Sequence, residues 1–175
     1  MAKKPRTSSR TLRLPPVEHG LRKLLAVGPP VSEATRKVML ANRGRDTKPE
    51  MLVRRALHAA GLRYRLHDPK LPGRPDIVLP GRRTIIEVRG CFWHGHEGCR
   101  GAHTPKTRSE FWQKKIATNQ RRDARNEALL KEDGWSVHIL WECEAKEPER
   151  LNSLIREVRD QPPRSRIKGS ASTQR

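Results

Sequence analysis

Apolar residues recur with helical or strand-like spacing between residues 47 and 158, and this pattern predicts a mixed set of helices and strands. Thr47 and Glu50 form a capping box with Pro49 in the first turn, which predicts a helix that ends at Gly61. Short apolar runs predict strands over residues 63–67, 76–79, 84–89 and 135–141. Further helices are predicted over 32–42, over 109–131, and around Leu151, Leu154, Ile155 and Val158. The order α-α-β-β-β-α-β-α predicts an α/β domain.

The two ends of the chain differ in composition from the segment between them. Residues 1–30 and 161–175 are rich in Pro, Ser and Arg, so they cannot bury enough apolar surface to fold. We therefore predict a disordered basic arm over 1–30, a folded domain over 31–160 and a disordered basic tail over 161–175.

The chain is strongly basic, with 38 Lys and Arg against 19 Asp and Glu and a formal net charge of +19. Nucleic acid is the predicted partner, because each phosphate that a basic side chain neutralises releases condensed counterions. No apolar run approaches the roughly 18 residues of a membrane span, which excludes an integral membrane protein. The sequence has no apolar signal segment and an odd number of cysteines, so we expect an intracellular protein with reduced thiols.

Cysteine and histidine are concentrated in the segment 91–99, CFWHGHEGC. Cys91, His96 and Cys99 have the spacing C-x4-H-x2-C, and with the remote Cys143 they form a Cys3His set that is typical of structural zinc sites. A Zn²⁺ ion would hold together a loop that has little apolar mass of its own. The alternative is that the thiols are free and buried as small hydrophobic groups.

Two acids and a cation are expected to meet at the end of the predicted hairpin. Asp76 begins one strand, and Glu87 and Arg89 lie near the end of the next. Two carboxylates on adjacent strands with a cation beside them can hold Mg²⁺ and a scissile phosphate. This arrangement resembles the PD-(D/E)xK nucleases, with Arg89 in the position of their lysine.

Several further segments occur in an ordered series: 72–76 (PGRPD), 90–94 (GCFWH), 107–123, 134–135 (GW) and 141–143 (WEC). Together they resemble the very short patch repair (Vsr) DNA mismatch endonucleases, over roughly residues 35–145. The resemblance implies a restriction-endonuclease-like PD-(D/E)xK fold, with a mixed central sheet flanked by helices and a structural zinc site. It also implies Mg²⁺-dependent nicking of DNA 5′ to the thymine of a T:G mismatch, which is the product of 5-methylcytosine deamination.

The resemblance assigns roles to individual catalytic residues. Asp76 would be the essential Mg²⁺ ligand, and the backbone carbonyl of Val88 would be a second ligand. His94 would activate water or contact the phosphate, and Asp123 would orient its imidazole. Glu50, on the first capped helix, would hold metal-bound water.

Two residues depart from the family pattern. Arg89 stands where the pattern has a catalytic-site histidine, and Glu87 stands where it has an apolar residue. Because these residues are two apart on one strand, their side chains share a face and restore an E-x-K-like layout. We hypothesise that Glu87 is a direct Mg²⁺ ligand and Arg89 a phosphate-stabilising cation. The alternative is a local ion pair between the two.

Aromatic residues are the candidate mismatch contacts. The resemblance implies that Phe92, Trp93 and Trp112 form a wedge that enters the base stack, and a mismatched step costs less to open than a paired one. The alternative for Trp112 is packing in the interior. Lys115 and Asn119, one helical turn apart on the same face as Trp112, would contact DNA bases or backbone.

The remaining histidines have no comparable neighbours in the sequence. We expect ordinary loop or surface positions for His19, His58, His67, His103 and His138. Trp135 and Trp141 flank a predicted strand and are expected to pack in the core.

The favoured hypothesis is a monomeric, zinc-stabilised mismatch endonuclease that acts on double-stranded DNA in the bacterial cytoplasm or nucleoid, with mismatch-repair proteins as candidate partners. One alternative is a zinc-stabilised DNA-binding protein that has lost cleavage. Another is a nuclease with broader mismatch or restriction-like specificity. An RNA-binding role fits the charge equally well but gives no reason for the acids and the cysteine set.

Overall fold

The computed structural model describes residues 33, 37 and 44–162. The chain divides into two compact units, Met1–Arg45 and Asp46–Arg175, and every helix and strand that carries a label below belongs to the second. The arms predicted over 1–30 and 161–175 lie outside the described residues, apart from positions 161 and 162. Of the helix predicted over 32–42, only Glu33 and Lys37 are described, and both are helical.

The second unit contains four α-helices and four strands within the described residues. The helices are α3 (Lys48–Ala59), α4 (Cys91–His94), α5 (Ser109–Glu132) and α6 (Pro148–Asp160). The strands are β1 (Arg65–Leu66), β2 (Ile77–Leu79), β3 (Thr84–Arg89) and β4 (Ser136–Trp141). Short 3-10 turns lie at Pro80–Arg82, Arg100–Ala102 and Glu144–Lys146. No helix in the described segments combines the length and the apolarity that crossing a bilayer requires.

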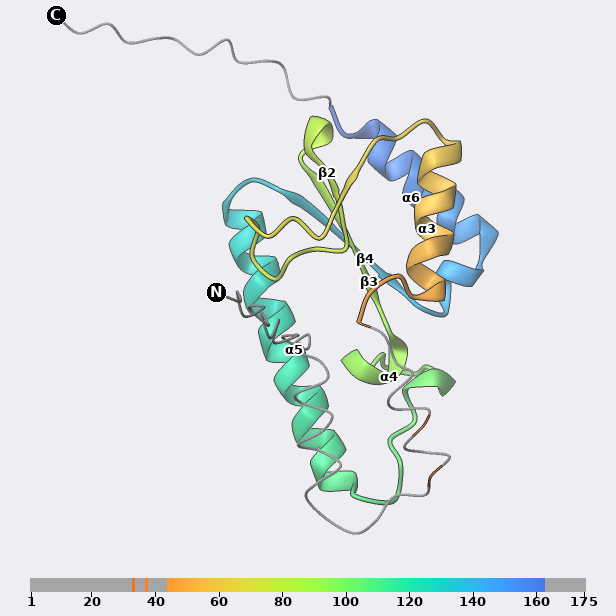
Figure 1. Ribbon diagram of the computed structural model, residues 1–175, viewed down its shortest axis with the longest axis vertical. Coiled ribbons are helices and arrows are strands. Elements are labelled where there is room, and N and C mark those ends of the chain that lie inside the picture. The colour runs from red at the N-terminus through yellow and green to blue at the C-terminus, as the bar shows by residue number, and fades with distance from the viewer. Residues whose placement is uncertain (1–32, 34–36, 38–43, 163–175) are drawn as a thin grey trace, which may run out of the picture. The chain divides into compact units, whose positions relative to one another are not determined.

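The strands form one mixed sheet in the order β1-β2-β3-β4. β2 pairs with β1 and with β3 in antiparallel fashion, whereas β3 and β4 are parallel. A parallel pair needs a long crossover, and α5 supplies it between β3 and β4. Figure 1 shows α5 on one face of the sheet and α3 and α6 on the other. The expectation of a mixed sheet flanked by helices is therefore confirmed.

Each face of the sheet has its own hydrophobic cluster. Ile77, Leu79 and Ile86 pack with residues of α3 and α6, and Val88 lies against the same cluster. Val78 and Ile85 pack with Leu130 of α5 on the opposite face. Because side chains alternate along a strand, Glu87 and Arg89 follow Ile85 onto the α5 face. Burial of Ile85 and Ile86 on opposite faces of the sheet thus places the charged side chains at the end of β3 on the face that α5 covers.

The capping box at the start of α3 forms as predicted. The hydroxyl of Thr47 accepts a hydrogen bond from the backbone N–H of Glu50 and donates one to the Glu50 carboxylate, at 3.4 and 2.9 Å. The Glu50 carboxylate also accepts the backbone N–H of Asp46 at 3.0 Å. These bonds satisfy donors that a helix start leaves unpaired, and they hold Glu50 in a buried position (4% exposed).

Candidate active site and metal centre

Asp76 is held at the point where the β2–β3 pairing ends. Its Oδ2 atom accepts a hydrogen bond of 2.9 Å from the backbone N–H of Val88. In an extended strand the N–H and C=O of one residue point toward the same neighbouring strand, so the Val88 carbonyl faces Asp76 as well. The structure therefore places a carboxylate and a backbone carbonyl side by side, and both are oxygen ligands that suit Mg²⁺.

The surroundings of Asp76 disfavour its charge. The pKa of its carboxyl is raised to about 7, chiefly by burial and also by the charges of Glu50 and Glu87, while the Val88 N–H and the Arg54 charge act in the opposite direction. A divalent cation would relieve both the burial and the repulsion between carboxylates. The residues present thus fit a metal at Asp76.

Glu87 and Arg89 lie together on the α5 face, as the strand alternation requires. Arg89 forms an ion pair with Glu87 at 2.7 Å, and its Nη2 atom also reaches Glu127 of α5 at 3.4 Å. Lys131 pairs with Glu127 at 2.8 Å. The geometry is that of the local ion pair considered as the alternative above, and Glu87 is at the same time close enough to Asp76 to raise its pKa.

A polar cluster occupies the ends of α3 and β1 near Asp76. The Arg54 guanidinium donates to Asp46 at 2.5 Å and to Glu50 at 2.9 Å, and its Nη2 atom lies 3.3 Å from Nε2 of His67. The Nδ1 atom of His67 lies 3.9 Å from Oδ1 of Asp76. His67 was expected at an ordinary loop or surface position, but its side chain is only 16% exposed and adjoins the acidic centre.

His94 and Asp123 meet as the resemblance implied. The Nδ1 atom of His94, at the end of α4, lies 2.5 Å from Oδ2 of Asp123 on α5. Arg122 donates to the other carboxylate oxygen at 3.0 Å. Burial alone would raise the pKa of Asp123, but the hydrogen bond from His94 and the charges of His94 and Arg122 outweigh it and hold this pKa below its ordinary value. Asp123 is therefore an ionised partner that fixes the imidazole.

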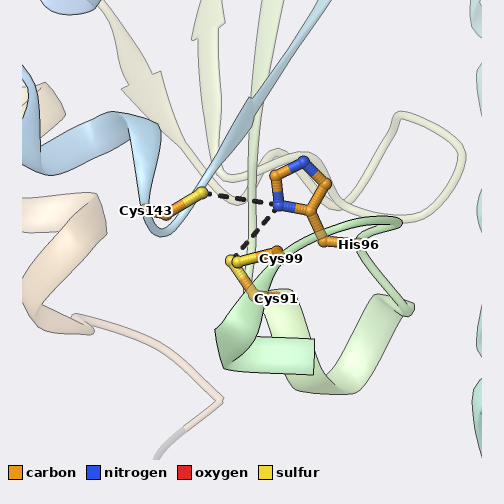
Figure 2. A group of neighbouring side chains, drawn as sticks. All are labelled: Cys91, His96, Cys99 and Cys143. Atoms are coloured by element: carbon orange, nitrogen blue, oxygen red, sulfur yellow. Dashed lines mark hydrogen bonds between the residues drawn. The ribbon is translucent and has the colours of Figure 1, made fainter. Parts of the chain in front are cut away.

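The four candidate zinc ligands come together at one end of the sheet, where the parallel strands β3 and β4 both terminate. Cys91 begins α4 directly after β3, His96 and Cys99 follow in the next loop, and Cys143 lies just after β4, as Figure 2 shows. Their ligand atoms all lie within 4.8 Å of one another. Nδ1 of His96 lies 3.5 Å from the Cys91 sulfur and 3.4 Å from the Cys143 sulfur.

These spacings suit a tetrahedral ion. Metal–ligand bonds of ~2.3 Å to sulfur and ~2.0 Å to nitrogen give a tetrahedral edge of roughly 3.5 Å between sulfur and nitrogen. The His96 ring stacks on Trp141 of β4, with ring centroids 4.2 Å apart and an interplanar angle of 2°, so its orientation is fixed. Burial raises the pKa of the Cys91 thiol to about 12, whereas the N–H of Gly101 lowers that of Cys99. The cluster could bind a metal ion.

The candidate wedge residues form a compact aromatic cluster. Trp112 makes edge-to-face contacts with Phe92, Trp93 and Phe111, at centroid distances of 5.1, 5.9 and 5.3 Å. Trp112 is buried (5% exposed), whereas Phe111, which sequence reasoning left out, is 37% exposed. Phe92 and Trp93 are half-buried. In this structure Trp112 is the buried member of the cluster, and the three more exposed rings pack against it.

The two polar residues predicted to contact DNA differ in position. Lys115 is exposed on α5. Asn119 is buried, and its side-chain amide donates to the backbone carbonyl of Trp93 at 2.9 Å. Gln120 donates similarly to the carbonyl of His94 at 3.1 Å. Asn119 and Gln120 thereby fasten α4 to α5.

Three residues at the site gave no clear signal in the sequence. Arg54 looks like an ordinary charged residue of an amphipathic helix, and Glu127 resembles the other acids of the charged helix. His67 follows a short strand and shows no ligand spacing. Each acquires its contacts only when α3, β1 and α5 pack around the sheet, so tertiary structure alone reveals them.

Comparison with known proteins agrees with this geometry. The sequence model of the family described as DNA mismatch endonuclease Vsr matches residues 31–100. The type II nicking enzyme V.XorIIP of Xanthomonas oryzae pv. oryzae is 46% identical over 128 residues, which cover 73% of this chain and 93% of the relative. The type II nicking enzyme V.NmeAIP of Neisseria meningitidis serogroup A is 46% identical over 127 residues, 70% of this chain and 90% of the relative. The DNA mismatch endonuclease Vsr of Escherichia coli is 45% identical over 120 residues, covering 68% and 76%.

The fold, the acidic centre and these relatives define an endonuclease whose substrate is DNA. The chain belongs to the Vsr family of DNA mismatch endonucleases and related nicking enzymes.

Proposed function

We propose that this protein is a Mg²⁺-dependent, strand-specific endonuclease that nicks DNA 5′ to the thymine of a T:G mismatch arising from 5-methylcytosine deamination. The observation that carries the proposal is the placement of Asp76 beside the Val88 backbone, where the carboxylate is fixed at 2.9 Å from the Val88 N–H. The similarity to the Escherichia coli protein described as a DNA mismatch endonuclease supports the target.

Asp76 and the Val88 carbonyl would hold the metal, with Glu87 as a further ligand. A Mg²⁺ ion bound there would neutralise the charge that builds up on the scissile phosphate. Glu50, buried and oriented by three donors, would accept hydrogen bonds from water at this centre. Arg89 would stabilise the phosphate once DNA draws it away from its ion pair with Glu87.

His94 is the candidate general base or phosphate contact. Its Nδ1 atom is bonded to Asp123, which leaves Nε2 for the reaction. In a neutral ring, Nε2 would accept a proton from water, and in a protonated ring it would donate to a phosphate oxygen. The ionised Asp123 stabilises the imidazolium that forms when the proton is accepted. The pair therefore supports either role named for His94.

Zinc is the proposed occupant of the Cys91, His96, Cys99 and Cys143 cluster. The site is closed by four protein ligands, which is the arrangement of structural rather than catalytic zinc. It would join the end of β3 to the end of β4, and α4, which carries His94, begins at one of its ligands. A zinc ion held there would thereby position His94 through the backbone.

The aromatic cluster is the proposed mismatch wedge. Phe92 and Trp93 are the half-buried members that would enter the base stack, and Trp112 would brace them from below or follow them after a rearrangement. Opening a mismatched step costs less than opening a paired one, and this difference would contribute to selectivity. Lys115 would contact the DNA, and Asn119 would hold the Trp93 backbone in place.

We propose further that the enzyme acts as a monomer on duplex DNA in the cytoplasm or nucleoid, with mismatch-repair proteins as partners. The basic arms would add sequence-independent affinity that falls with salt, because counterion release drives such binding. The folded domain supports this role through the exposed basic residues of α5, among them Lys114, Lys115, Arg121, Arg122 and Arg125.

A nicking assay tests the proposal. An end-labelled duplex with one central T:G pair and its T:A control are incubated with zinc-loaded protein, with and without Mg²⁺. We expect one nick beside the thymine, only in the T:G duplex and only with Mg²⁺. Asp76→Asn should abolish it, and Asp160→Asn, which changes an exposed acid at the end of α6, should not.

The other outcomes identify the competing functions. Tight binding of the T:G duplex without any cut would contradict the endonuclease proposal and favour a DNA-binding protein that has lost cleavage. Cleavage of both duplexes would keep the nuclease but remove the mismatch specificity, in line with relatives described simply as type II nicking enzymes.

A further inference from the structure

Asp46, Glu50 and His67 are residue types that could hold a metal cation. In this structure, however, the positive charge among them is the guanidinium of Arg54. Ligand atoms of Asp46, Glu50 and His67 lie within 4.8 Å of one another. The Arg54 guanidinium contacts all three, at 2.5, 2.9 and 3.3 Å. Arg54 is buried (5% exposed), and a buried guanidinium is stable only with such charged and polar partners. The cluster is therefore held by Arg54.

Arg54 also determines which nitrogen of His67 carries the proton. A guanidinium only donates hydrogen bonds, so Nε2 of His67, 3.3 Å from Nη2 of Arg54, must accept. A neutral imidazole that accepts at Nε2 carries its proton on Nδ1. That Nδ1 atom lies 3.9 Å from Oδ1 of Asp76. The ring thus presents a donor, and not a metal-binding lone pair, to the Asp76 carboxylate.

The backbone keeps His67 in this place. Its own N–H donates to the backbone carbonyl of Asp76 at 3.4 Å, directly after β1 ends. Its φ of 48° lies in the left-handed region, which is uncommon for a residue other than glycine and is often found at functional sites. His67 is therefore bonded to Asp76 through the main chain, and this bond keeps their side chains as neighbours, 3.9 Å apart.

We propose that Arg54 and His67 are positioning residues for Asp76, an inference that rests on the proposed role of Asp76 as the metal-binding carboxylate. The Val88 N–H fixes Oδ2, and the Nδ1–H of His67 faces Oδ1. The hydrogen bond to Oδ2 and a donor that faces Oδ1 would together set the plane of the carboxylate, so that the remaining lone pairs point to one place. The 3.9 Å separation is longer than a hydrogen bond, and on this proposal it would shorten to one when metal and DNA bind, as long catalytic contacts of unliganded active sites commonly do.

Two variants at one position separate this role from simple packing. His67→Ala removes the donor, whereas His67→Gln keeps an amide N–H for Asp76 and a carbonyl oxygen that can accept from Arg54. His58→Ala is the matched control, because His58 makes the same kind of contact, 3.3 Å from an arginine (Arg63), on the exposed face of α3. Residues that orient a metal ligand typically contribute about 10-fold or more to metal affinity.

The first measurement is binding of Mn²⁺, as a probe for Mg²⁺, to the zinc-loaded full chain, followed by the loss of the free Mn²⁺ EPR signal. We expect His67→Ala to raise the Kd about 10-fold, and His67→Gln and His58→Ala to keep it within about twofold of wild type. Equal affinities of His67→Ala and wild type would overturn the inference. If wild type binds no Mn²⁺ that Asp76→Asn removes, the proposed metal centre itself fails, and the inference fails with it.

The second measurement needs no variant. A long-range ¹H–¹⁵N correlation spectrum of histidine-labelled wild-type protein reports which ring nitrogen of His67 carries the proton. We expect a protonated Nδ1 and an unprotonated Nε2 near neutral pH. The opposite tautomer would overturn the inference even if His67→Ala failed to fold, and it would leave the nicking activity of the proposed function unaffected.

Discussion

His94 and Asp123, which are 29 positions apart in the sequence, lie with Nδ1 and Oδ2 only 2.5 Å from each other. The contact joins the end of α4 to the middle of α5, and Gln120, on the same helix, bonds the His94 backbone carbonyl at 3.1 Å. His94 is thus held both through its imidazole ring, by Asp123, and through its backbone carbonyl, by Gln120. A side chain that must exchange a proton with water benefits from such fixation, because only one orientation of the ring is productive.

Replacing Asp123 by Asn should therefore slow nicking without weakening DNA binding. The amide is similar in size but carries no charge, so it neither holds the Nδ1 proton as strongly nor stabilises an imidazolium. We expect the single-turnover rate on a T:G duplex to fall by about 100-fold, within the range of general acid–base contributions. Gel-shift affinity should stay within about twofold of wild type. A rate unchanged from wild type would show that His94 acts without Asp123.

The raised pKa of Asp76 predicts a pH-dependent stability. The folded-state pKa of about 7 lies above the ordinary value of 3.8, so the folded chain binds this proton more tightly than the unfolded chain. Without Mg²⁺, Asp76 therefore costs nothing below pH 4 and destabilises the fold increasingly as the pH rises to 7. The difference corresponds to at most about 4 kcal/mol, and partial solvent contact of the side chain reduces our expectation to about 2 kcal/mol.

Urea unfolding of wild type and Asp76→Asn at pH 4 and pH 8 measures this effect. The variant should gain about 2 kcal/mol relative to wild type between the two pH values. The buffer must be depleted of Mg²⁺ with a resin and contain no chelator, and the two proteins are compared at each pH so that a change in the cysteine cluster at pH 4 affects both equally. Added Mg²⁺ should stabilise wild type at pH 8 and leave the variant unchanged. An equal pH response of the two proteins would mean that Asp76 is not perturbed.

Loss of one ligand from the cysteine cluster should destabilise the domain. Cys143→Ser removes the ligand that joins β4 to the loop after α4. We expect a loss of bound Zn²⁺ by mass spectrometry under native conditions, and a decrease in Tm of roughly 10 °C, corresponding to about 3 kcal/mol. His103→Ala is the control, because His103 is exposed in the same loop region and does not belong to the cluster. Wild-type protein that contains no zinc after purification would contradict the assignment.

Helices and strands with a regular hydrophobic spacing were predicted well from the sequence. The strand predicted over 84–89 is β3 (Thr84–Arg89), because a turn and a β-branched apolar run define both ends. The helix predicted over 109–131 is α5 (Ser109–Glu132). The Cys3His set and the meeting of His94 with Asp123 also followed from sequence spacing or from the family resemblance, and the structure brings both groups together.

The rest depends on packing that spacing does not encode. α4 has only four residues, which are too few to show a helical hydrophobic period. Two of them, Cys91 and His94, are a candidate zinc ligand and a candidate catalytic residue. The inner face of α5 consists of Trp112, Asn119, Asp123 and Leu130, which have helical spacing but include two polar residues. A hydrophobicity pattern counts Asn119 as solvent-facing, whereas the structure buries it against the Trp93 carbonyl. His67 was missed for the same reason, since its partners come from α3 and from the start of β2.

Two neighbouring residues of the aromatic cluster, Trp112 and Phe111, should differ in their effects on stability and on DNA binding, because one is buried and the other exposed. Trp112→Ala removes the buried centre of the cluster and should cost about 3 kcal/mol of stability. Phe111→Ala changes an exposed ring and should cost less than about 1 kcal/mol. If Phe111 contacts DNA, its loss should weaken gel-shift affinity for T:G and T:A duplexes about fivefold, since base–aromatic stacking contributes about 1 kcal/mol or more. Stability near wild type in Trp112→Ala would contradict the burial seen here.

Arg89 lies between two acids, and these acids provide a matched test of the metal centre. Both Glu87 and Glu127 pair with Arg89, at 2.7 and 3.4 Å, but only Glu87 is close enough to raise the pKa of Asp76. Glu87→Gln and Glu127→Gln each remove one negative charge beside Arg89. Any effect that acts through Arg89 should therefore occur in both variants.

A direct ligand role for Glu87 predicts a difference between the two. Glu87→Gln should raise the Mg²⁺ concentration for half-maximal nicking about 10-fold or more, because an amide is a weaker ligand for a hard cation than a carboxylate. Glu127→Gln should leave that concentration within about twofold, even if it changes the maximal rate. Equal Mg²⁺ dependence in both variants would instead mean that Glu87 serves only to hold Arg89. The chain would then use Asp76 and the Val88 carbonyl alone as its protein ligands, with the ion pair as a replacement for the family's histidine.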